Sequence, residues 1–433
     1  MLDARGRIGT EEFAERSAQA DEKLRELGAT FPLPGDPAGK ERILPADWMP
    51  RIIPKDHWET LSAGLLQRGR AINTWLVELY NGEQDVVPRK IIESNVFYRP
   101  HTLPDCALPF PIRVYGPDVV HLESGEYVVL EDNVRVPSGV AYAEAIRRAG
   151  LEALSDLYDP YRVCGIFEYY SVLRQTLEVA APSGIEEPRI VVMTRGEDDP
   201  AYFEHSRAAE ACGLQLLTLS DCYVEGGEVR DSSDGRRIDV IYRRFDEDYV
   251  ESALPELEEV YLEGRANFVN AVGVGVADDK AVFPYVPTMI ERYLEEEPIL
   301  ENVPTLSASE PEDREEVLDR LDELVLKPRE GYGGQGLVIG PEADQETLEN
   351  ARQSIKKNPA GFVVQETVDF STHLVNGTDG GGPAEAYVDL RAFVLPAAGY
   401  VMPGGLTRVA NPGTRIVNSS AGGGFKDTLV LEG

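Results

Sequence analysis

The sequence predicts an α/β protein with lobes of α+β character, mainly helical at its beginning and followed by two α/β regions. Its 433 residues exceed what one hydrophobic core usually serves, so we expect two or three domains. From about residue 150 onward, short apolar runs rich in β-branched residues alternate with stretches of helical periodicity. Hydrophobic residues make up 42% of the chain, which is enough for packed cores.

The first ninety residues are expected to be mainly helical. Residues 61–80 (LSAGLLQRGRAINTWLVELY) carry apolar side chains at helical spacing, after Pro/Gly breaks at 32–39. A strand-rich piece follows at about 108–133, which contains VYGPDVVHLESGEYVVLEDN. We therefore expect helices first and a group of paired strands after them.

The middle of the chain alternates between strand and helix patterns. RIVVMTRG (189–196) is expected to be a buried strand, and residues 201–213 a helix that ends at a glycine. LQLLTLSDCYV (214–224) and DVIYRRF (239–245) are expected to be further strands. These four segments predict a small α/β lobe.

A second α/β region is predicted after a helical stretch at about 251–300. It begins with DELVLKPREGYGGQGLVIG (322–340) and continues with a helix at 342–356 and a strand at 362–368. A polar, glycine-rich loop and further strands complete it, and we expect them at 376–385, 387–395 and 401–427.

Composition excludes several classes of function. The net charge is -34, from 76 acidic against 42 basic residues, so no basic surplus exists to bind nucleic acid. Only nine lysines are present, and the excess of acidic residues resembles an adaptation to high salt.

The four cysteines lack the spacing of a zinc site or a disulfide scaffold. No apolar run approaches membrane-spanning length, and we expect a cytoplasmic protein that does not enter a membrane.

A glycine-rich segment at 331–336 predicts a phosphate-binding loop. Its residues GYGGQG match GxGxxG, but the apolar run LVIG that follows predicts a strand, whereas a dinucleotide fingerprint opens a helix. Backbone N–H groups of such a loop can approach phosphate closely, and Lys327 before it can add a positive charge. The alternative is a glycine-rich hairpin with an exposed lysine. The four glycines concerned are Gly331, Gly333, Gly334 and Gly336.

Acidic residues on a predicted β-hairpin indicate a cation site. A two-residue turn at Ser124-Gly125 would set Asp118 directly opposite Glu131, with Asn133 on the same face as Glu131. Two carboxylates across a ladder repel each other, and a divalent cation removes the repulsion. Mg²⁺ takes one or two carboxylates, a carbonyl-type oxygen and substrate phosphates. The alternative is a solvated acidic edge, which we expect for Asp132 on the opposite face.

These motifs resemble the circularly permuted ATP-grasp family. VLKPREGYGGQG is similar to the phosphate loop of that family, and LEDN in YVVLEDNVRVPSG is similar to its E-x-N metal motif, which here precedes the loop instead of following it. Further segments occur in the order of the family, and the likeness runs from about residue 43 onward. They are HTLPDCALPFPIRVYGPD, AYFEHSRAAEACG, DVIYRRFDED, DDKAVFPYVPTM, VDLRAF and GGLTRVANPGTRIVNSSAGGGFKD.

The resemblance implies a circularly permuted ATP-grasp fold with a helical N-terminal region and a Rossmann-like lobe. The expected parts are the helical region at 1–90, the metal-binding part at 91–150, the Rossmann-like lobe at 151–265 and the nucleotide-binding lobe with C-terminal strands at 266–433. It also implies that Lys280 and Lys327 contact phosphates of ATP, with a surface lysine as the alternative for Lys280. The adenine hinge is expected at Gln365 to Val368, where Glu366 would contact the ribose or the amino group.

Three arginines and an asparagine complete the implied site. Arg391, Arg408 and Asn418 are similar to positions that hold the γ-phosphate or acyl phosphate and a second metal, although Arg391 on an apolar strand is also compatible with a paired core arginine. Arg135 is expected to bind the substrate carboxylate or to cap the acidic turn. With Asp118, Glu131 and Asn133, these residues imply ATP and Mg²⁺ as cofactors.

The activity that the resemblance implies is ATP-dependent ligation of a carboxylate to an amine. ATP would activate the carboxylate as an acyl phosphate, and the amine would then displace phosphate. The substrate would be a small molecule or peptide, and a protein partner stays open. Two alternatives use the same residues: a phosphotransferase that acts on a hydroxyl group, and a non-catalytic nucleotide-binding scaffold.

Overall fold

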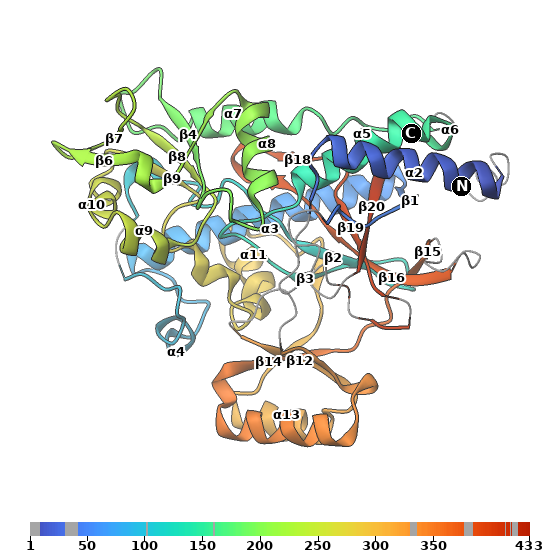
Figure 1. Cartoon of the computed structure of the whole chain (residues 1–433). Coiled ribbons are helices and arrows are strands. Elements are labelled where there is room, and N and C mark those ends of the chain that lie inside the picture. The colour runs from blue at the N-terminus through green and yellow to red at the C-terminus, as the bar shows by residue number, and fades with distance from the viewer. Residues whose placement is uncertain are drawn as a thin grey trace.

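The structure is a computed structural model that describes residues 9–30, 42–100, 103–158, 161–329, 336–375, 384–411, 413–415, 417 and 423–433. Three sheets organise this part of the chain (Figure 1). A mixed sheet of eight strands forms the body. A four-stranded parallel sheet and a four-stranded antiparallel sheet belong to two further lobes, at the upper left and at the bottom of the view in Figure 1. Among these residues, no helix combines the length and apolar character needed to cross a membrane.

The body sheet brings together strands from both ends of the chain. Its order is β1-β20-β19-β16-β2-β3-β10, and β15 pairs with β16 outside this path. The bounds are β1 Ala46–Ile53, β20 Gly424–Val430, β19 Leu406–Val409, β16 Ala384–Arg391, β2 Asp118–His121, β3 Tyr127–Glu131, β10 Glu301–Asn302 and β15 Thr372–Val375. β1 and β10 pair in parallel with β20 and β3, and the other pairs are antiparallel.

The strand β1 lies among the first ninety residues, whose described part is otherwise mainly helical as expected, and the sequence did not predict it. It joins the last strand, β20, with Ala46 opposite Phe425. The sequence ADWMPRII has no strict alternation of apolar and polar residues, because the strand is buried or half-buried along its whole length. A pairing between the two ends of a chain leaves no local signal, so sequence periodicity could not reveal it.

The long helix α3, Lys55–Asn81, confirms the predicted helix at 61–80 and extends it at the N-terminal side. It ends at Gly82, whose φ of 78° is the left-handed conformation typical of a helix C-cap. Its buried side chains include Trp58, Leu65 and Trp75, and they join the largest hydrophobic core. The helix crosses the centre of the molecule and supports the body sheet (Figure 1).

The parallel sheet confirms the α/β lobe predicted for the middle of the chain. The expected single strand at 214–224 is wrong, because a 3-10 helix divides it into strands at 215–217 and 222–225, and only the first of these joins the parallel sheet. Its order is β5-β4-β8-β9, and all its pairs are parallel. The bounds are β5 Gln215–Leu217, β4 Ile190–Met193, β8 Val240–Arg243 and β9 Asn267–Val269. Every residue of β4 and β8 is buried, as expected for central strands covered on both faces. The helices α7 Tyr169–Glu178 and α8 Tyr202–Cys212 pack together beside it, and β6 Cys222–Glu225 forms a hairpin with β7 Glu228–Asp231.

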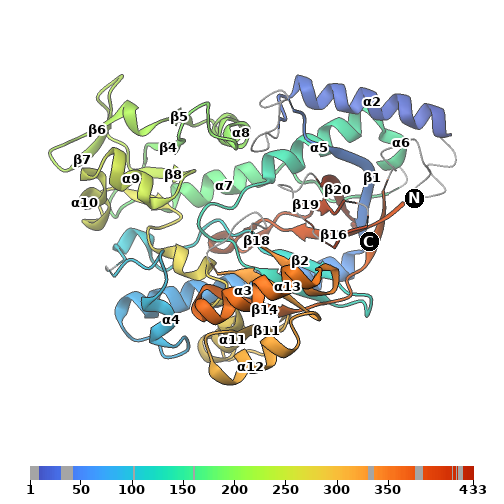
Figure 2. The ribbon, with the colours of Figure 1, turned by 60° about the horizontal axis from the view of Figure 1, so that its bottom comes forward.

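The antiparallel sheet belongs to a small lobe, defined here as residues 303–366. Its order is β11-β14-β12-β13. The bounds are β11 Thr305–Ser307, β14 Phe362–Glu366, β12 Leu324–Pro328 and β13 Val338–Ile339, with helices α12 Pro311–Asp319 and α13 Gln345–Lys357. The lobe has its own core, formed by residues such as Leu324, Leu348 and Val364. It projects from the body, with α12 and α13 on its outer side (Figures 1 and 2).

The remaining described elements connect the three sheets. The helices are α2 Thr10–Glu26, α4 Arg89–Glu93, α5 Val140–Ala153, α6 Ser155–Tyr158, α9 Glu247–Ala253, α10 Glu256–Leu262 and α11 Val286–Leu294. The strands β17 Val394–Leu395 and β18 Tyr400–Val401 form a small hairpin. Short 3-10 helices are η2 Asp105–Ala107, η3 Leu219–Asp221, η4 Val274–Asp278, η5 Phe283–Tyr285, η6 Gly340–Glu342, η7 Pro359–Gly361 and η8 Pro396–Ala398.

Candidate functional site

The acidic hairpin β2-β3 has the predicted pair of carboxylates, but a longer turn than predicted connects its two strands. Asp118 lies opposite Glu131, as predicted. The expected two-residue turn is wrong, because three residues, 123–125, connect the strands, with Leu122 N–H donating to the carbonyl of Glu126 at 2.8 Å. Gly125 closes this turn with a φ of 94°. The longer turn shifts the register by one residue, and a bulge at Leu130 shifts it back before Glu131.

A row of charged side chains crosses one face of the body sheet, and we call it the charged row. Residues directly opposite on neighbouring strands share a face. Arg408 on β19 is opposite Asp389 on β16, and Arg391 on β16 is opposite Asp118 on β2. Since Asp389 and Arg391 are two residues apart on one strand, all four side chains lie on the face that carries Glu131. The row therefore alternates basic and acidic groups.

Asp118 is held between two arginines. Arg391 donates to it through Nε and Nη2, both at 2.7 Å, and Nη2 of Arg408 lies 2.9 Å from Oδ2 of Asp118. Burial would raise the pKa of Asp118, but the two guanidinium groups outweigh burial and lower the pKa to about 2. Asp118 is therefore a carboxylate at neutral pH. Arg391 and Arg408 both lie at the predicted metal-binding pair.

Asp389 is a site residue that the sequence interpretation missed. Its carboxylate is 1% exposed and accepts a 2.9 Å hydrogen bond from Nε of Arg408, besides a closer contact from Nη2. Burial raises the pKa of Asp389, although Arg408 opposes the increase. The signal was present in VDLRAF, where Asp389 stands two residues before Arg391 and so shares its face. Asp389 orients Arg408 toward Asp118.

Two predicted lysines meet the acidic pair from other parts of the chain. Nζ of Lys280 lies 3.2 Å from Oε1 of Glu131. Lys327 on β12 interacts electrostatically with Glu131, Lys280, Asp118 and Arg408. Burial, with smaller contributions from the charges of Lys280 and Arg408, lowers the pKa of Lys327 to about 8, despite the opposing effect of the carboxylates. The small lobe therefore contributes a partly buried ammonium group to the charged row.

Oxygen ligands for a hard cation are present at this pair. Nδ2 of Asn133 donates to Oδ2 of Asp118 at 3.4 Å, so the asparagine amide lies against the carboxylate. Among the described residues, no cluster of three or more His, Cys, Asp or Glu side chains is arranged to hold a metal ion. Two carboxylates and an amide suffice for Mg²⁺ that also binds substrate phosphates, so Asp118, Glu131 and Asn133 fit that ion.

Asp132 corrects the expectation of a solvated acidic edge. It is 3% exposed and accepts two hydrogen bonds from Arg68 on α3, at 2.7 and 2.8 Å, and one from the Tyr115 hydroxyl at 2.5 Å. Arg68 is itself 1% exposed. The pair anchors the hairpin to α3, which fixes the opposite face that carries Glu131 and Asn133.

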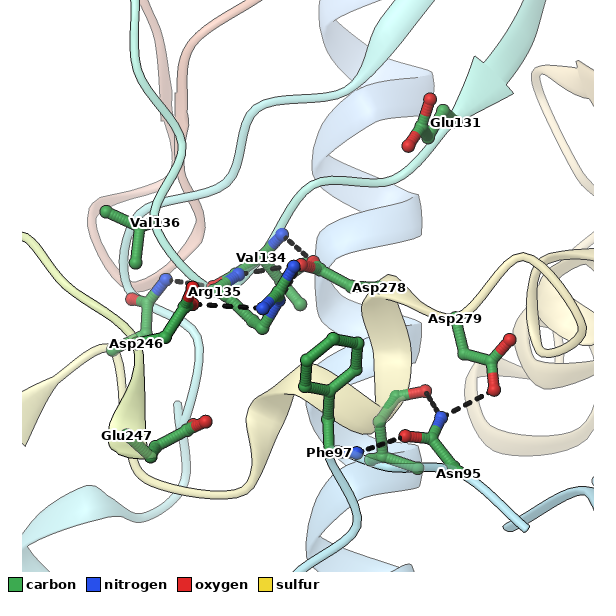
Figure 3. A network of polar contacts seen from close by, with 12 residues as sticks. Asn95, Phe97, Glu131, Val134, Arg135, Val136, Asp246, Glu247, Asp278 and Asp279 are labelled. Atoms are coloured by element: carbon green, nitrogen blue, oxygen red, sulfur yellow. Dashed lines mark hydrogen bonds and ion pairs between the residues drawn. The ribbon is translucent and has the colours of Figure 1, made fainter. Parts of the chain in front are cut away.

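Arg135 lies in an ionic network beside the hairpin (Figure 3). Nε donates to Asp278 at 2.6 Å, Nη1 donates to Asp246 at 3.0 Å, and the guanidinium carbon lies 3.8 Å from the centre of the Phe97 ring. Asp278 also accepts hydrogen bonds from the backbone N–H groups of Val134 and Arg135. Arg135 therefore ties the hairpin to the parallel-sheet lobe, and its contact with a substrate stays a prediction.

The predicted adenine hinge lies where the small lobe joins the body. Gln365 is 4% exposed, and its amide nitrogen Nε2 donates to the Leu130 carbonyl at 3.3 Å. Val368 packs against the core beneath the hairpin. Glu366 forms a bidentate pair with Arg320, at 3.0 and 2.9 Å, so its side chain has a partner inside the small lobe. Its predicted contact with the nucleotide stays a prediction.

Some predicted residues lie outside the described residues. They are Gly331, Gly333, Gly334 and Asn418. Gly336, the last glycine of the loop, is described, and its φ of 73° is a conformation that favours glycine. A Cβ atom there would lie 2.8 Å from Cγ of Pro328. The end of the loop thus turns back closely over β12, next to Lys327.

Several proteins are similar to this chain along most of its length. An uncharacterized protein of Synechocystis sp. is 38% identical over 455 residues, which cover 100% of this chain and 94% of that protein. An uncharacterized protein of Mycobacterium tuberculosis is 39% identical over 452 residues, covering 98% and 80% of the two chains. A protein of Frankia casuarinae, named as a candidate glutamate–cysteine ligase, is 40% identical over 446 residues, but this chain spans only 51% of its length.

A solved structure shares the fold at low sequence identity. It is a glutathione synthetase-like effector from Globodera pallida in its apo form, with a TM-score of 0.62 and 12% identity. The match covers 98% of this chain and 99% of the effector. At that identity the likeness concerns the fold alone.

The order of the two motifs along the chain is the one expected for a circularly permuted ATP-grasp protein. The hairpin with its E-x-N motif precedes the strand of Lys327 in the chain, although both lie at one site. The profile of the family described as circularly permuted ATP-grasp type 2 matches residues 50–410. ATP-grasp proteins generally use ATP and Mg²⁺. The chain belongs to the circularly permuted ATP-grasp family of type 2.

Proposed function

We propose that this protein is an ATP-dependent carboxylate–amine ligase that forms an amide or peptide bond and releases ADP and phosphate. One observation carries the proposal. Lys327 from the small lobe, Lys280 from the segment after η4, and the charged row from three strands of the body sheet meet at the acidic pair of Asp118 and Glu131. Such a mixture of cations and hard oxygen ligands suits a triphosphate bound together with a divalent cation.

The proposal assigns each residue a role. Lys280 and Lys327 hold phosphates of ATP, together with backbone N–H groups of the glycine-rich loop. The segment from Gln365 to Val368, including Glu366, forms the adenine hinge. Mg²⁺ would be held by Asp118, Glu131 and Asn133, with Asn418 as a further ligand, and it would supply charge neutralisation on the phosphate oxygens.

The reaction in this proposal has two steps. An oxygen of the substrate carboxylate attacks the γ-phosphorus of ATP, the bond to the bridging β,γ-oxygen breaks, and ADP leaves. The amine nitrogen then attacks the acyl carbon, the carbon–oxygen bond to phosphate breaks, and the amine proton goes to solvent. Arg391 and Arg408 would stabilise the negative charge on the transferred phosphoryl group. The chain therefore needs no nucleophilic side chain of its own.

Trapping with hydroxylamine tests the ligase function. Candidate amino acids and short peptides are incubated with the protein, ATP and Mg²⁺, with and without hydroxylamine, and ADP and hydroxamate are measured. We expect a hydroxamate equimolar with ADP for the true carboxylate substrate. A phosphorylated hydroxyl product without hydroxamate would identify a phosphotransferase instead. Saturable binding of Mg-ATP with no ADP from any candidate would favour the scaffold. The Frankia name makes glutamate and cysteine the first candidates to test.

Because the pKa of Lys327 is lowered, nucleotide binding is expected to be accompanied by proton uptake. The pKa of Lys327 is about 8 in the free protein, so this amine is mostly neutral at pH 8.5 and mostly charged at pH 6.5. A bound triphosphate favours the charged amine and raises its pKa. We therefore expect Mg-ATP binding to take up about three quarters of a proton through this group at pH 8.5 and far less at pH 6.5. Titration calorimetry in buffers of different ionisation enthalpy measures the uptake, and equal uptake at both pH values would contradict the assignment.

A further inference from the structure

Three consecutive residues, Asp278, Asp279 and Lys280, reach two different segments of the site. Asp278 accepts hydrogen bonds from Arg135 and from the hairpin backbone, and Lys280 contacts Glu131. Asp279 pairs with Arg329, which follows β12. Figure 3 shows Asp278 and Asp279 on one stretch of chain next to the hairpin. This short segment therefore contacts both the metal-binding hairpin and the small lobe.

The pair of Asp279 and Arg329 is buried and has many contacts. Nε of Arg329 donates to Oδ1 and Oδ2 of Asp279 at 2.8 and 2.7 Å, and Nη2 lies 2.6 Å from Oδ2. The other Arg329 donors reach the Ser94 hydroxyl at 2.8 Å and the Ile91 carbonyl at 2.6 Å, and Asn95 donates to Asp279 at 2.6 Å. The two residues are 4% and 7% exposed. They join the small lobe to the body with fixed geometry.

Asp279 and Arg329 are close in the chain to Lys280 and Lys327, so their ion pair affects how far apart the two lysines lie. Arg329 follows Lys327 by two residues at the end of a strand, and residues two apart in a strand face the same side. Lys280 follows Asp279 directly. Joining Asp279 to Arg329 therefore brings the segment of Lys327 next to the segment of Lys280. The ion pair sets the separation between two groups that we assign to phosphate binding.

Without an anion, the two ammonium groups repel each other. Lys280 destabilises the charged form of Lys327, whereas Glu131, which contacts Lys280, stabilises it more strongly. Glu131 attracts both flexible lysine side chains, but holding their two backbone segments together before ATP binds requires a separate link. The buried Arg–Asp pair supplies it, because its members lose their partners and stay desolvated if the segments separate.

We propose that Asp279 and Arg329 form a latch that holds Lys327 beside Lys280 before the nucleotide binds, which makes both of them positioning residues. The inference rests on the proposed function, since the ligand of the lysines is taken to be Mg-ATP. Neither Asp279 nor Arg329 contacts the phosphates in this proposal. Preorganisation of charge avoids reorganisation when the triphosphate arrives, and a misplacement of about 1 Å in such a site can cost about 100-fold.

A double-mutant cycle on the full chain tests the latch. The variants are Asp279→Asn, Arg329→Met and the double variant, and the readout is the Kd of Mg-ATP from titration calorimetry. We expect each single variant to raise Kd about 10- to 100-fold, and the double variant to raise it no further, because the two side chains act as one unit. Additive losses, or single variants that bind like the wild type, would overturn the latch.

A second buried ion pair provides the matched control. Arg147 and Asp427 lie 2.5 Å apart, with side chains 2% and 3% exposed, and link α5 to β20. Arg147→Met should lower Tm, as the latch variants do, while the Kd for Mg-ATP stays within twofold of the wild type. If Arg147→Met weakens binding as much as Arg329→Met does, general loss of packing explains both, and the latch is wrong.

A measurement on Lys327 in the absence of nucleotide tests the latch independently of the proposed function. Acetic anhydride labels Lys327 in proportion to its neutral amine, and mass spectrometry of the peptide at several pH values gives the pKa. In the latch variants Lys327 moves away from Lys280 and from its buried site, so we expect its pKa to rise toward the ordinary lysine value. An unchanged pKa in both single variants would refute the latch. Absence of Mg-ATP binding by the wild type would instead refute the proposed function.

Discussion

Replacing Lys327 by alanine is expected to reduce turnover of ATP by about 100- to 1,000-fold, the usual cost of removing one preorganised electrostatic group from a transition state. The ammonium group is partly buried and interacts with the carboxylates of Glu131 and Asp118. ADP release with a saturating carboxylate substrate is the measurement. The loss should appear in both kcat and the affinity for ATP, since phosphate is bound before and during transfer.

The same substitution should leave the fold intact. The folded-state pKa of Lys327 lies below the ordinary value of 10.5, so the charged lysine opposes folding at pH 7, and this cost disappears only as the pH rises through about 8 toward 10.5. Removing the charge is therefore expected to leave Tm at pH 7 unchanged or raised. The control is Lys356→Ala, an exposed lysine on α13 of the same lobe. Wild-type turnover by Lys327→Ala would remove this residue from the site.

Replacing Asp118 by asparagine is expected to affect both activity and stability. Arg391 and Arg408 would lose the carboxylate that they share, although Asp389 still pairs with Arg408. Breaking a buried pair by removing one partner costs about 3–5 kcal/mol, so the free energy of unfolding should fall by about that amount in urea denaturation at pH 7. Turnover that depends on Mg²⁺ should be lost as well, because a predicted metal ligand is gone.

The dependence of this destabilisation on pH provides a second check. The pKa of Asp118 is about 2 in the folded protein, below its ordinary value of 3.8, so its contribution to stability is present above pH 3.8 and is lost as the pH falls through about 2. The difference in stability between wild type and Asp118→Asn should therefore shrink from pH 4 downward. Glu123→Gln, an exposed change at the turn of the same hairpin, should stay within about 0.5 kcal/mol of the wild type. A stable, active Asp118→Asn variant would contradict the central role of Asp118.

The acidic hairpin shows how far local sequence information reaches. The alternation of side chains on two adjacent strands, joined by a turn with glycine, predicts that Asp118 faces Glu131, and this pair is present. The turn itself was predicted one residue too short, and the bulge at Leu130 compensated for the error. Which side chains share a face of two neighbouring strands follows from the alternation of a few adjacent residues. The length of the turn between the strands depends on small energy differences, which the sequence pattern does not show.

Ion pairs between distant segments were not predictable in the same way. Arg391 and Asp118 are 273 residues apart in the chain, and Asp279 and Arg329 are 50 apart. The segments DDK and KPRE were visible in the sequence, but only their lysines were assigned, because nothing local indicates which arginine an aspartate will meet. Asp132 illustrates the same limit, since its buried partner Arg68 comes from a helix.

The sequence by itself determined the types of most elements, the strands β12 and β13 on either side of the glycine-rich segment, and the family through the order of its motifs. These features depend on backbone preferences and on spacing within short segments, which the sequence records directly. Only the tertiary structure decided that β1 joins β20, that Asp389 orients Arg408, and that Asp279 holds Arg329 next to the lysines. Those contacts depend on where the whole chain buries its charges, because a charge removed from water is stable only beside a partner that folding brings to it.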